Sequence, residues 1–220
     1  MGKHGIPVYY RIISIPLRLF FHLLYHSFAW SYDFVARTVS LGMWRDWVLS
    51  VMPDLIGPRI LEIGHGTGWL QAAMLQAGKE IFGLDKSAQM GKLARKKSSQ
   101  QGQVPILARA TSQGIPFPSG SFDQAAATFP SEYIYEQGSL TEIHRVLKPG
   151  GTLAIIPVAW ITGEGWLHRL AAGLFRVTGQ AGEWSEAYLE PFKRAGFSCT
   201  VERRMVKSSQ VLIILAKKIT

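Results

Sequence analysis

The chain has 220 residues, enough for one sizeable hydrophobic core and too few for a second full domain to be expected. Hydrophobic residues make up 47% and charged residues 18%, which excludes a disordered chain and favours a globular protein with an apolar partner. The formal net charge of +9 favours acidic partners such as nucleic acid or anionic lipid headgroups. The single cysteine, Cys199, excludes an internal disulfide and a cysteine-cluster metal site, and it fits a cytoplasmic protein.

Residues 11–30 carry the pattern of an amphipathic helix. Their polar side chains recur at steps of three or four and form one narrow stripe, and large apolar side chains cover the rest. A membrane-spanning helix would bury Arg18 at a cost of about 2.5 kcal/mol or more. A helix in the headgroup plane avoids that cost, so we expect this segment to bind an anionic membrane surface from the cytoplasmic side. The alternative, a lid packed on the rest of the protein, stays open.

From residue 59 onward, strand and helix patterns alternate. Helices are predicted at 69–77, 88–98 and 139–147. Strands are predicted at 59–63, 80–84, 105–108, 123–128 and 152–157, and a closing antiparallel hairpin at 197–203 and 211–217. This order predicts an α/β, Rossmann-like, doubly wound and mostly parallel seven-stranded sheet. Residues 1–50 are expected to form the amphipathic helix and a cap segment, and residues 51–220 the main domain.

A glycine-rich turn follows the first predicted strand, in the sequence LEIGHGTGWL. Gly64, Gly66 and Gly68 let the backbone turn tightly and approach a ligand. Dinucleotide folds have G-x-G-x-x-G instead, which leaves room for a pyrophosphate at the helix N-terminus. Asp85 ends the second predicted strand, where a carboxylate can accept hydrogen bonds from both ribose hydroxyls. Alone, these features predict an ordinary turn and an ordinary helix N-cap, whereas together they favour an adenosyl cofactor.

Four segments between residues 59 and 157 resemble, in order and spacing, the motifs of class I S-adenosylmethionine-dependent methyltransferases. These segments are LEIGHGTG, FGLDKSAQM, PFPSGSFD and EIHRVLKPGGTLAI. The resemblance implies that residues 51–220 bind S-adenosyl-L-methionine and release S-adenosyl-L-homocysteine. It implies that Glu62 and the three glycines line the methionine end, that Asp85 holds the ribose, and that Ser87 and Met90 flank the ribose and adenine.

Other predicted cofactor contacts rest on position alone. They are His65 in the turn, Lys86 after Asp85, Phe129 after the fourth strand, and Thr111. The family often has an aspartate shortly before its Pro-Phe segment to bind the adenine amino group. This chain has Ala110, Thr111 and Ser112 there, so Thr111 is the predicted adenine contact.

Upstream, the segment SYDFVARTVSLGMWRDW resembles the one that precedes the cofactor motifs in ubiquinone and menaquinone C-methyltransferases. The matching residues are Tyr32, Asp33, Ser40, Leu41, Gly42 and Trp44. The implied role is a cap over the cofactor, with Tyr32 near the sulfonium. Simple helix packing is the alternative.

Acceptor contacts are expected after the strand predicted at 123–128, where Glu132 and Tyr133 are the candidate catalytic residues. His168, in an aromatic and aliphatic insertion, is the candidate auxiliary base. The Asn or Asp-Pro-Pro-aromatic run of nucleic-acid amino methyltransferases is missing, which argues against nucleic acid. No metal is predicted.

We therefore expect a lipophilic small-molecule acceptor, either a quinone precursor or a phospholipid amine. A soluble acceptor or RNA, and a non-catalytic adenosyl-binding partner protein, are the alternatives. The glycine spacing disfavours a nicotinamide oxidoreductase.

Overall fold

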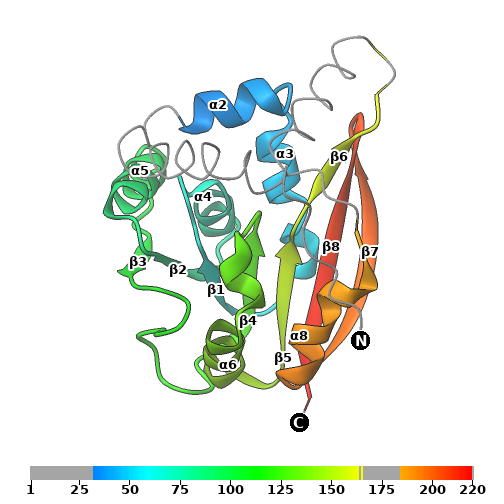
Figure 1. Cartoon of the computed structure of the whole chain (residues 1–220). Helices are drawn as coiled ribbons and strands as arrows, with labels where there is room; N and C mark the ends of the chain where they lie inside the picture. Colours follow the sequence, from blue (N-terminus) through cyan, green and yellow to red (C-terminus); the bar gives the residue numbers. More distant parts are fainter. Residues whose placement is uncertain (1–31, 164, 166–183, 220) are drawn as a thin grey trace, which may run out of the picture.

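The computed structural model describes residues 32–163, 165 and 184–219, and its central feature is one mixed sheet of eight strands (Figure 1). In chain order the strands are β1 (Arg59–Ile63), β2 (Glu80–Asp85), β3 (Ile106–Arg109), β4 (Phe122–Thr128), β5 (Leu147–Ile156), β6 (Ala159–Ile161), β7 (Phe197–Val206) and β8 (Ser209–Lys218). The α-helices are α2 (Tyr32–Val39), α3 (Trp44–Leu49), α4 (Trp69–Gln76), α5 (Ala88–Ser99), α6 (Gln137–Val146) and α8 (Glu190–Arg194). Short 3-10 helices are η2 (Met52–Asp54), η3 (Glu132–Tyr135) and η4 (Glu186–Leu189).

The sheet has the strand order β3-β2-β1-β4-β5-β8, and β6 and β7 also pair with β8. Strands β1 to β5 are parallel, and β8 runs antiparallel to β5, β6 and β7. This arrangement confirms the predicted Rossmann-like fold and its closing hairpin. The expected strand number was one too low, because β6 pairs with β8 beyond the end of β5. Pro157 lies between β5 and β6, and its missing N–H interrupts the ladder there.

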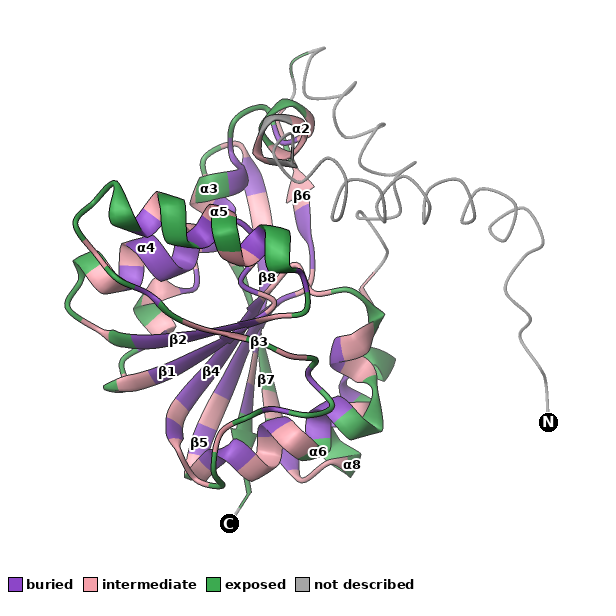
Figure 2. Cartoon of the chain, turned by 90° about the vertical axis from the view of Figure 1, so that its left-hand side faces the viewer, coloured by how far each residue is buried: buried purple, intermediate pink, exposed green. Residues whose placement is uncertain are grey.

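Helices cover both faces of the sheet (Figure 2). One face packs against α3 and α4, with Trp47, Leu70 and Met74 in its core. The other face packs against α6 and α8, with Ile143 and Phe192 in its core. Strand β1 lies between these layers, which explains why Ile60, Leu61 and Ile63 are all apolar and buried. The predicted division at residue 50 stays a prediction.

Two predicted boundaries differ from the structure. The strand predicted at 152–157 begins earlier, because β5 already starts at Leu147, which pairs with Phe122 before a register shift. The hairpin loop is shorter than expected and consists of Lys207 and Ser208 alone. Lys207 adopts a φ of 53°, which suits a two-residue hairpin turn.

Candidate functional site

Three glycines shape the sharp turn that follows β1. Gly64, Gly66 and Gly68 have φ angles of 73°, 51° and 83°, in the left-handed region that favours glycine. A Cβ on Gly64 would lie 2.5 Å from the Tyr133 hydroxyl oxygen, and one on Gly68 would lie 2.7 Å from the Ala94 Cβ. A Cβ on Gly66 would meet nothing within 4 Å. The outer glycines therefore allow close contact with η3 and α5, while the middle one faces open space.

Asp85, at the carboxyl end of β2, lies beside this turn. Its Oδ2 accepts a hydrogen bond from the Gly66 N–H at 3.0 Å, and its Oδ1 accepts one from the Ser87 N–H at 2.8 Å. A carboxylate offers about four acceptor positions, so Asp85 can accept further bonds from ligand hydroxyls. Ser87 is the N-cap of α5, since its Oγ accepts from the Met90 N–H. Asp85 is therefore not the helix cap, and its geometry fits the predicted ribose contact.

Glu62 lies on β1 and accepts a hydrogen bond from Gln71 of α4. Gln71 Nε2 donates to Glu62 Oε2 at 2.9 Å and to the Phe82 carbonyl at 3.3 Å. Burial raises the pKa of Glu62 to about 8, and the nearby charge of Asp85 acts in the same direction. Burial therefore favours the neutral form of this carboxyl. A ligand cation nearby would favour its charged form, which fits a methionine ammonium at this end of the site.

Helix α2 is fastened to the turn through Asp33. Its Oδ1 accepts hydrogen bonds from Thr67 Oγ1 at 2.6 Å and Trp69 Nε1 at 3.2 Å. Its Oδ2 accepts from Lys97 Nζ at 2.9 Å, and that ammonium lies 3.4 Å from the centroid of the Trp69 ring. The cap segment therefore contacts the cofactor turn directly, as the resemblance implied. The roles of Thr67, Trp69 and Lys97 were not predicted.

We expect Asp33→Asn to lower the free energy of unfolding by about 1 to 2 kcal/mol, because Lys97 loses its charged acceptor. Cofactor affinity should fall as well, since Thr67 and Trp69 lose part of their anchor. Urea unfolding and cofactor titration measure the two effects. Asp46→Asn is the matched control, because Asp46 pairs with the exposed Lys207 away from the turn and such pairs contribute at most about 1 kcal/mol. Equal effects of the two variants on cofactor affinity would contradict the anchoring role.

An aromatic cluster lies where β4 ends. The Phe129 ring stacks on Trp44 of α3, with centroids 4.5 Å apart, and lies 6.2 Å from the ring of Trp47. Phe129 has a φ of 49°, and its N–H donates to the Ile156 carbonyl at 2.7 Å. This unusual backbone conformation turns the chain out of the sheet. The residue predicted as a cofactor contact is thus part of an aromatic wall between β4 and α3.

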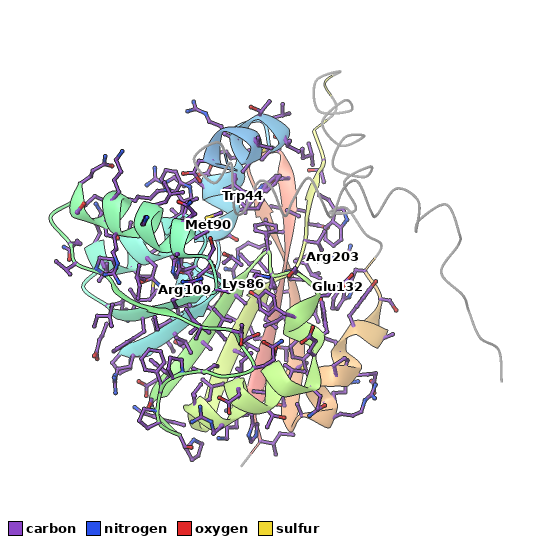
Figure 3. The ribbon with its side chains drawn as sticks, turned by 60° about the vertical axis from the view of Figure 1, so that its left-hand side comes forward. Trp44, Lys86, Met90, Arg109, Glu132 and Arg203 are labelled. Carbon is purple, nitrogen blue, oxygen red and sulfur yellow. The ribbon has the colours of Figure 1, made fainter. Side chains whose placement is uncertain are left out.

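The two candidate catalytic residues after β4 lie on η3. Tyr133 Oη donates to the Ile63 carbonyl at 3.3 Å, so this side chain contacts the glycine turn. Glu132 is exposed, and Figure 3 shows it and Lys86 near the carboxyl ends of the strands, with Trp44 above them in this view. The structure therefore brings Glu132 and Tyr133 to the predicted edge of the sheet. Their catalytic roles stay predictions.

His65 is buried, and it packs against β2. Its Nδ1 lies 2.9 Å from the Gly66 carbonyl oxygen, and a Cβ on Gly83 would lie 2.9 Å from its Cδ2. Burial lowers the pKa of His65, which favours the neutral imidazole. These contacts give it a packing role in the turn, while its predicted contact with the cofactor stays a prediction.

The remaining predicted residues are less well defined. Lys86 and Thr111 are exposed, after β2 and β3 respectively. His168 and the side chain of Tyr32 lie outside the described part of the structure, as do residues 11–30.

Comparisons with known proteins agree with this geometry. A family model described as a methyltransferase domain matches residues 61–155. A demethylmenaquinone methyltransferase of Lactiplantibacillus plantarum is 35% identical over 142 residues, which cover 60% of each chain. A ubiquinone/menaquinone biosynthesis C-methyltransferase of Geobacter is 34% identical over 143 residues, with the same coverage. The chain thus spans about 60% of the length of these curated relatives.

Solved methyltransferases share the fold at low sequence identity. A S-adenosylmethionine-dependent methyltransferase of Thermotoga maritima aligns with a TM-score of 0.62 at 20% identity, over 90% of this chain and 99% of its own. A geranyl diphosphate C-methyltransferase of Streptomyces coelicolor, solved with S-adenosyl-L-homocysteine, aligns with a TM-score of 0.58 at 16% identity, over 78% of each chain. These values support the fold.

The fold and the glycine turn are those of solved methyltransferases, and the methyltransferase-domain model matches the part of the chain that carries the turn and Asp85. The curated relatives reported above are menaquinone and ubiquinone methyltransferases, in agreement with the resemblance that the sequence carries. The residues present fit the cofactor, since Gly66 faces open space beside an aspartate with spare acceptor capacity.

Proposed function

We propose that this chain transfers a methyl group from S-adenosyl-L-methionine to a lipophilic small molecule at a membrane surface. The first candidate acceptor is a quinone precursor and the second is a phospholipid amine. The observation that carries the cofactor assignment in this proposal is the position of the Asp85 carboxylate beside the glycine turn, with the Asp33–Lys97 ion pair on the other side of the turn.

The contacts at the N-terminal end of α4 separate the proposal from a dinucleotide enzyme. Asp33 accepts hydrogen bonds from the side chains of Thr67 and Trp69 there, and it pairs with Lys97. A pyrophosphate would need that helix end, which these side chains already cover. A cofactor with an ammonium group does not need the helix end, and it gains from the carboxylate of Asp85.

The assignment of a lipophilic acceptor rests on the aromatic wall formed by Trp44 and Phe129 between β4 and α3. Where β4 ends, the half-buried ring of Phe129 stacks on the buried ring of Trp44, and η3 begins three residues later. Planar apolar rings bind well against such surfaces. The names of the relatives, with their quinone products, agree with this chemistry.

When bound, the cofactor would supply an electrophilic methyl group for in-line displacement, with S-adenosyl-L-homocysteine as the leaving group. The chain then has three tasks: to orient the acceptor, to exclude water and to accept a proton. We assign orientation to the Trp44–Phe129 wall and to Tyr133, which contacts the turn. We assign proton acceptance to Glu132, the carboxylate next to Tyr133 on η3.

Product identification tests this function directly. The full chain is incubated with methyl-labelled cofactor and, in separate reactions, a demethylated quinone precursor, phosphatidylethanolamine and a short RNA. Mass spectrometry then locates the label. We expect label on a ring carbon of the quinone precursor. Label only on RNA or on a water-soluble acceptor would overturn the lipophilic assignment.

The proposed contact with a membrane depends on residues 11–30, which lie outside the described residues. Among the described residues, no helix combines the length and apolar character that a membrane crossing requires. We expect deletion of residues 2–30 to weaken co-sedimentation with anionic liposomes strongly, while cofactor binding survives. A truncated chain that sediments with the liposomes as well as the full chain does would remove the role of this segment.

A further inference from the structure

The segment between Asp85 and Asp123 has an extreme charge balance. It contains no aspartate or glutamate, and it contains six cationic residues. These are Lys86, Lys92, Arg95, Lys96, Lys97 and Arg109. More than half of the excess positive charge of the chain therefore comes from one short stretch.

Five of these six cations reach the surface. Lys97 turns inward to Asp33, and the other five are exposed. They lie on α5, on β3 and on the loop after β2, at one edge of the sheet, and Figure 2 views the molecule from this side. None of the five pairs with an acid in the part of the chain that the structure describes. We call this surface the α5–β3 face.

A hollow opens on the α5–β3 face. Buried His65 and half-buried Asp85 lie at its inner end, and the exposed Lys92, Arg95 and Arg109 lie at its rim. One N–H of Arg95 donates to the Leu107 carbonyl at 3.4 Å, and the Nε of Arg109 donates to the Lys86 carbonyl at 3.2 Å. These bonds hold the two guanidinium groups in place and leave further donors for a phosphate oxygen.

The neighbours of these cations favour lipid over nucleic acid. Val104 and Ile106 are 83% and 49% exposed, and they lie at the N-terminal end of β3, close in sequence to Leu107, which lines the hollow. Residues 86–116 contain no Phe, Tyr or Trp. Single-stranded RNA is bound largely by aromatic stacking, which this face lacks, whereas cations beside exposed aliphatic side chains suit a headgroup layer.

We propose that the α5–β3 face docks on an anionic lipid bilayer, with a headgroup phosphate at the Arg95–Arg109 rim. This proposal rests on the proposed function in one respect, namely that the acceptor is reached from a membrane. It adds a second contact to the one expected from residues 11–30. Because Asp85 lies at the inner end of the hollow, docking places the cofactor end of the site close to the headgroups.

The test uses the full chain with four cations of the face replaced by glutamine: Lys92, Arg95, Lys96 and Arg109. The matched control removes four exposed cations from the opposite end of the sheet: Lys193, Arg194, Arg203 and Lys217. Partition onto vesicles of phosphatidylcholine with 30% phosphatidylglycerol, a composition of about one anionic lipid in three, is measured by sedimentation. We expect the face variant to partition at least about tenfold more weakly than the wild type, and the control variant to change by less than about threefold.

Four measurements decide the outcome: the salt dependence of binding, partition onto vesicles, binding to RNA, and methyl transfer. Binding of the wild type should weaken steeply between 0.1 and 0.5 M salt, roughly the range over which charges become screened. Equal partition of the face variant and the wild type would overturn the docking proposal. Loss of RNA binding by the face variant, with vesicle binding unchanged, would overturn it as well. Methyl transfer to a detergent-solubilised quinone precursor should be unchanged in the face variant. Loss of vesicle binding with transfer intact supports docking, while absence of transfer in the wild type defeats the proposed function separately.

Discussion

Replacing Asp85 by alanine is expected to weaken cofactor binding by about 1.5 to 3 kcal/mol, the range for hydrogen bonds to a charged group. The structure gives two reasons. The carboxylate has acceptor positions left for the ribose hydroxyls, and it also holds the N–H groups of Gly66 and Ser87 in place. The dissociation constant of S-adenosyl-L-methionine, measured by calorimetry, should therefore rise by about one to two orders of magnitude.

Two further variants make this prediction specific. Asp85→Asn keeps the shape of the side chain and one carbonyl acceptor, so its loss of affinity should be smaller than that of Asp85→Ala. Asp123→Asn changes the net charge equally, but Asp123 lies at the start of β4 and pairs with Lys148 there. An unaltered dissociation constant in Asp85→Ala, or an equal loss in Asp123→Asn, would refute the ribose assignment.

Gly68→Ala is expected to lower the free energy of unfolding by about 2 to 5 kcal/mol. The left-handed φ of 83° costs a residue with a Cβ about 1 to 2 kcal/mol. The new Cβ would also lie 2.7 Å from the Ala94 Cβ and 2.9 Å from its Cα, and overpacking of this kind costs about 1 to 3 kcal/mol. Urea denaturation should show the loss, because helices α4 and α5 must separate to admit the methyl group.

Gly66→Ala is the matched control for the conformational part. Its φ of 51° is also left-handed, but a Cβ there meets nothing within 4 Å. We expect it to cost only about 1 to 2 kcal/mol of stability. It should still impair cofactor binding, because the added methyl group enters the open space that the ligand needs. Equal losses of stability in the two variants would show that the contact with Ala94 is unimportant.

The main elements of the sheet could be predicted because the pattern of apolar and polar side chains along each element follows its burial. Strand β1 is apolar at Ile60, Leu61 and Ile63 since it is buried between two layers, and the glycine turn follows it without a gap. The hairpin of β7 and β8 was predictable because its strands are close in sequence. The same local information located Asp85 and the turn, and both came together as expected.

Other features depend on contacts between residues far apart in the sequence, which no local sequence pattern predicts. The contact of Asp33 with Lys97 joins residues 64 positions apart, and the bond from Tyr133 to Ile63 joins residues 70 positions apart. Strand β6 has only three residues, which are too few for a periodic pattern, and it forms because β8 extends beyond β5. Lys148-Pro149-Gly150 has the composition of a turn, yet pairing with β4 draws this stretch into β5.

The most direct test of the central claim is a pair of calorimetric titrations of the full chain, one with S-adenosyl-L-methionine and one with NAD. The Asp85 carboxylate beside the turn and the covered N-terminal end of α4 predict binding of one S-adenosyl-L-methionine per chain and no heat from NAD under the same conditions. Binding of NAD, with no response to S-adenosyl-L-methionine, would contradict the methyltransferase assignment.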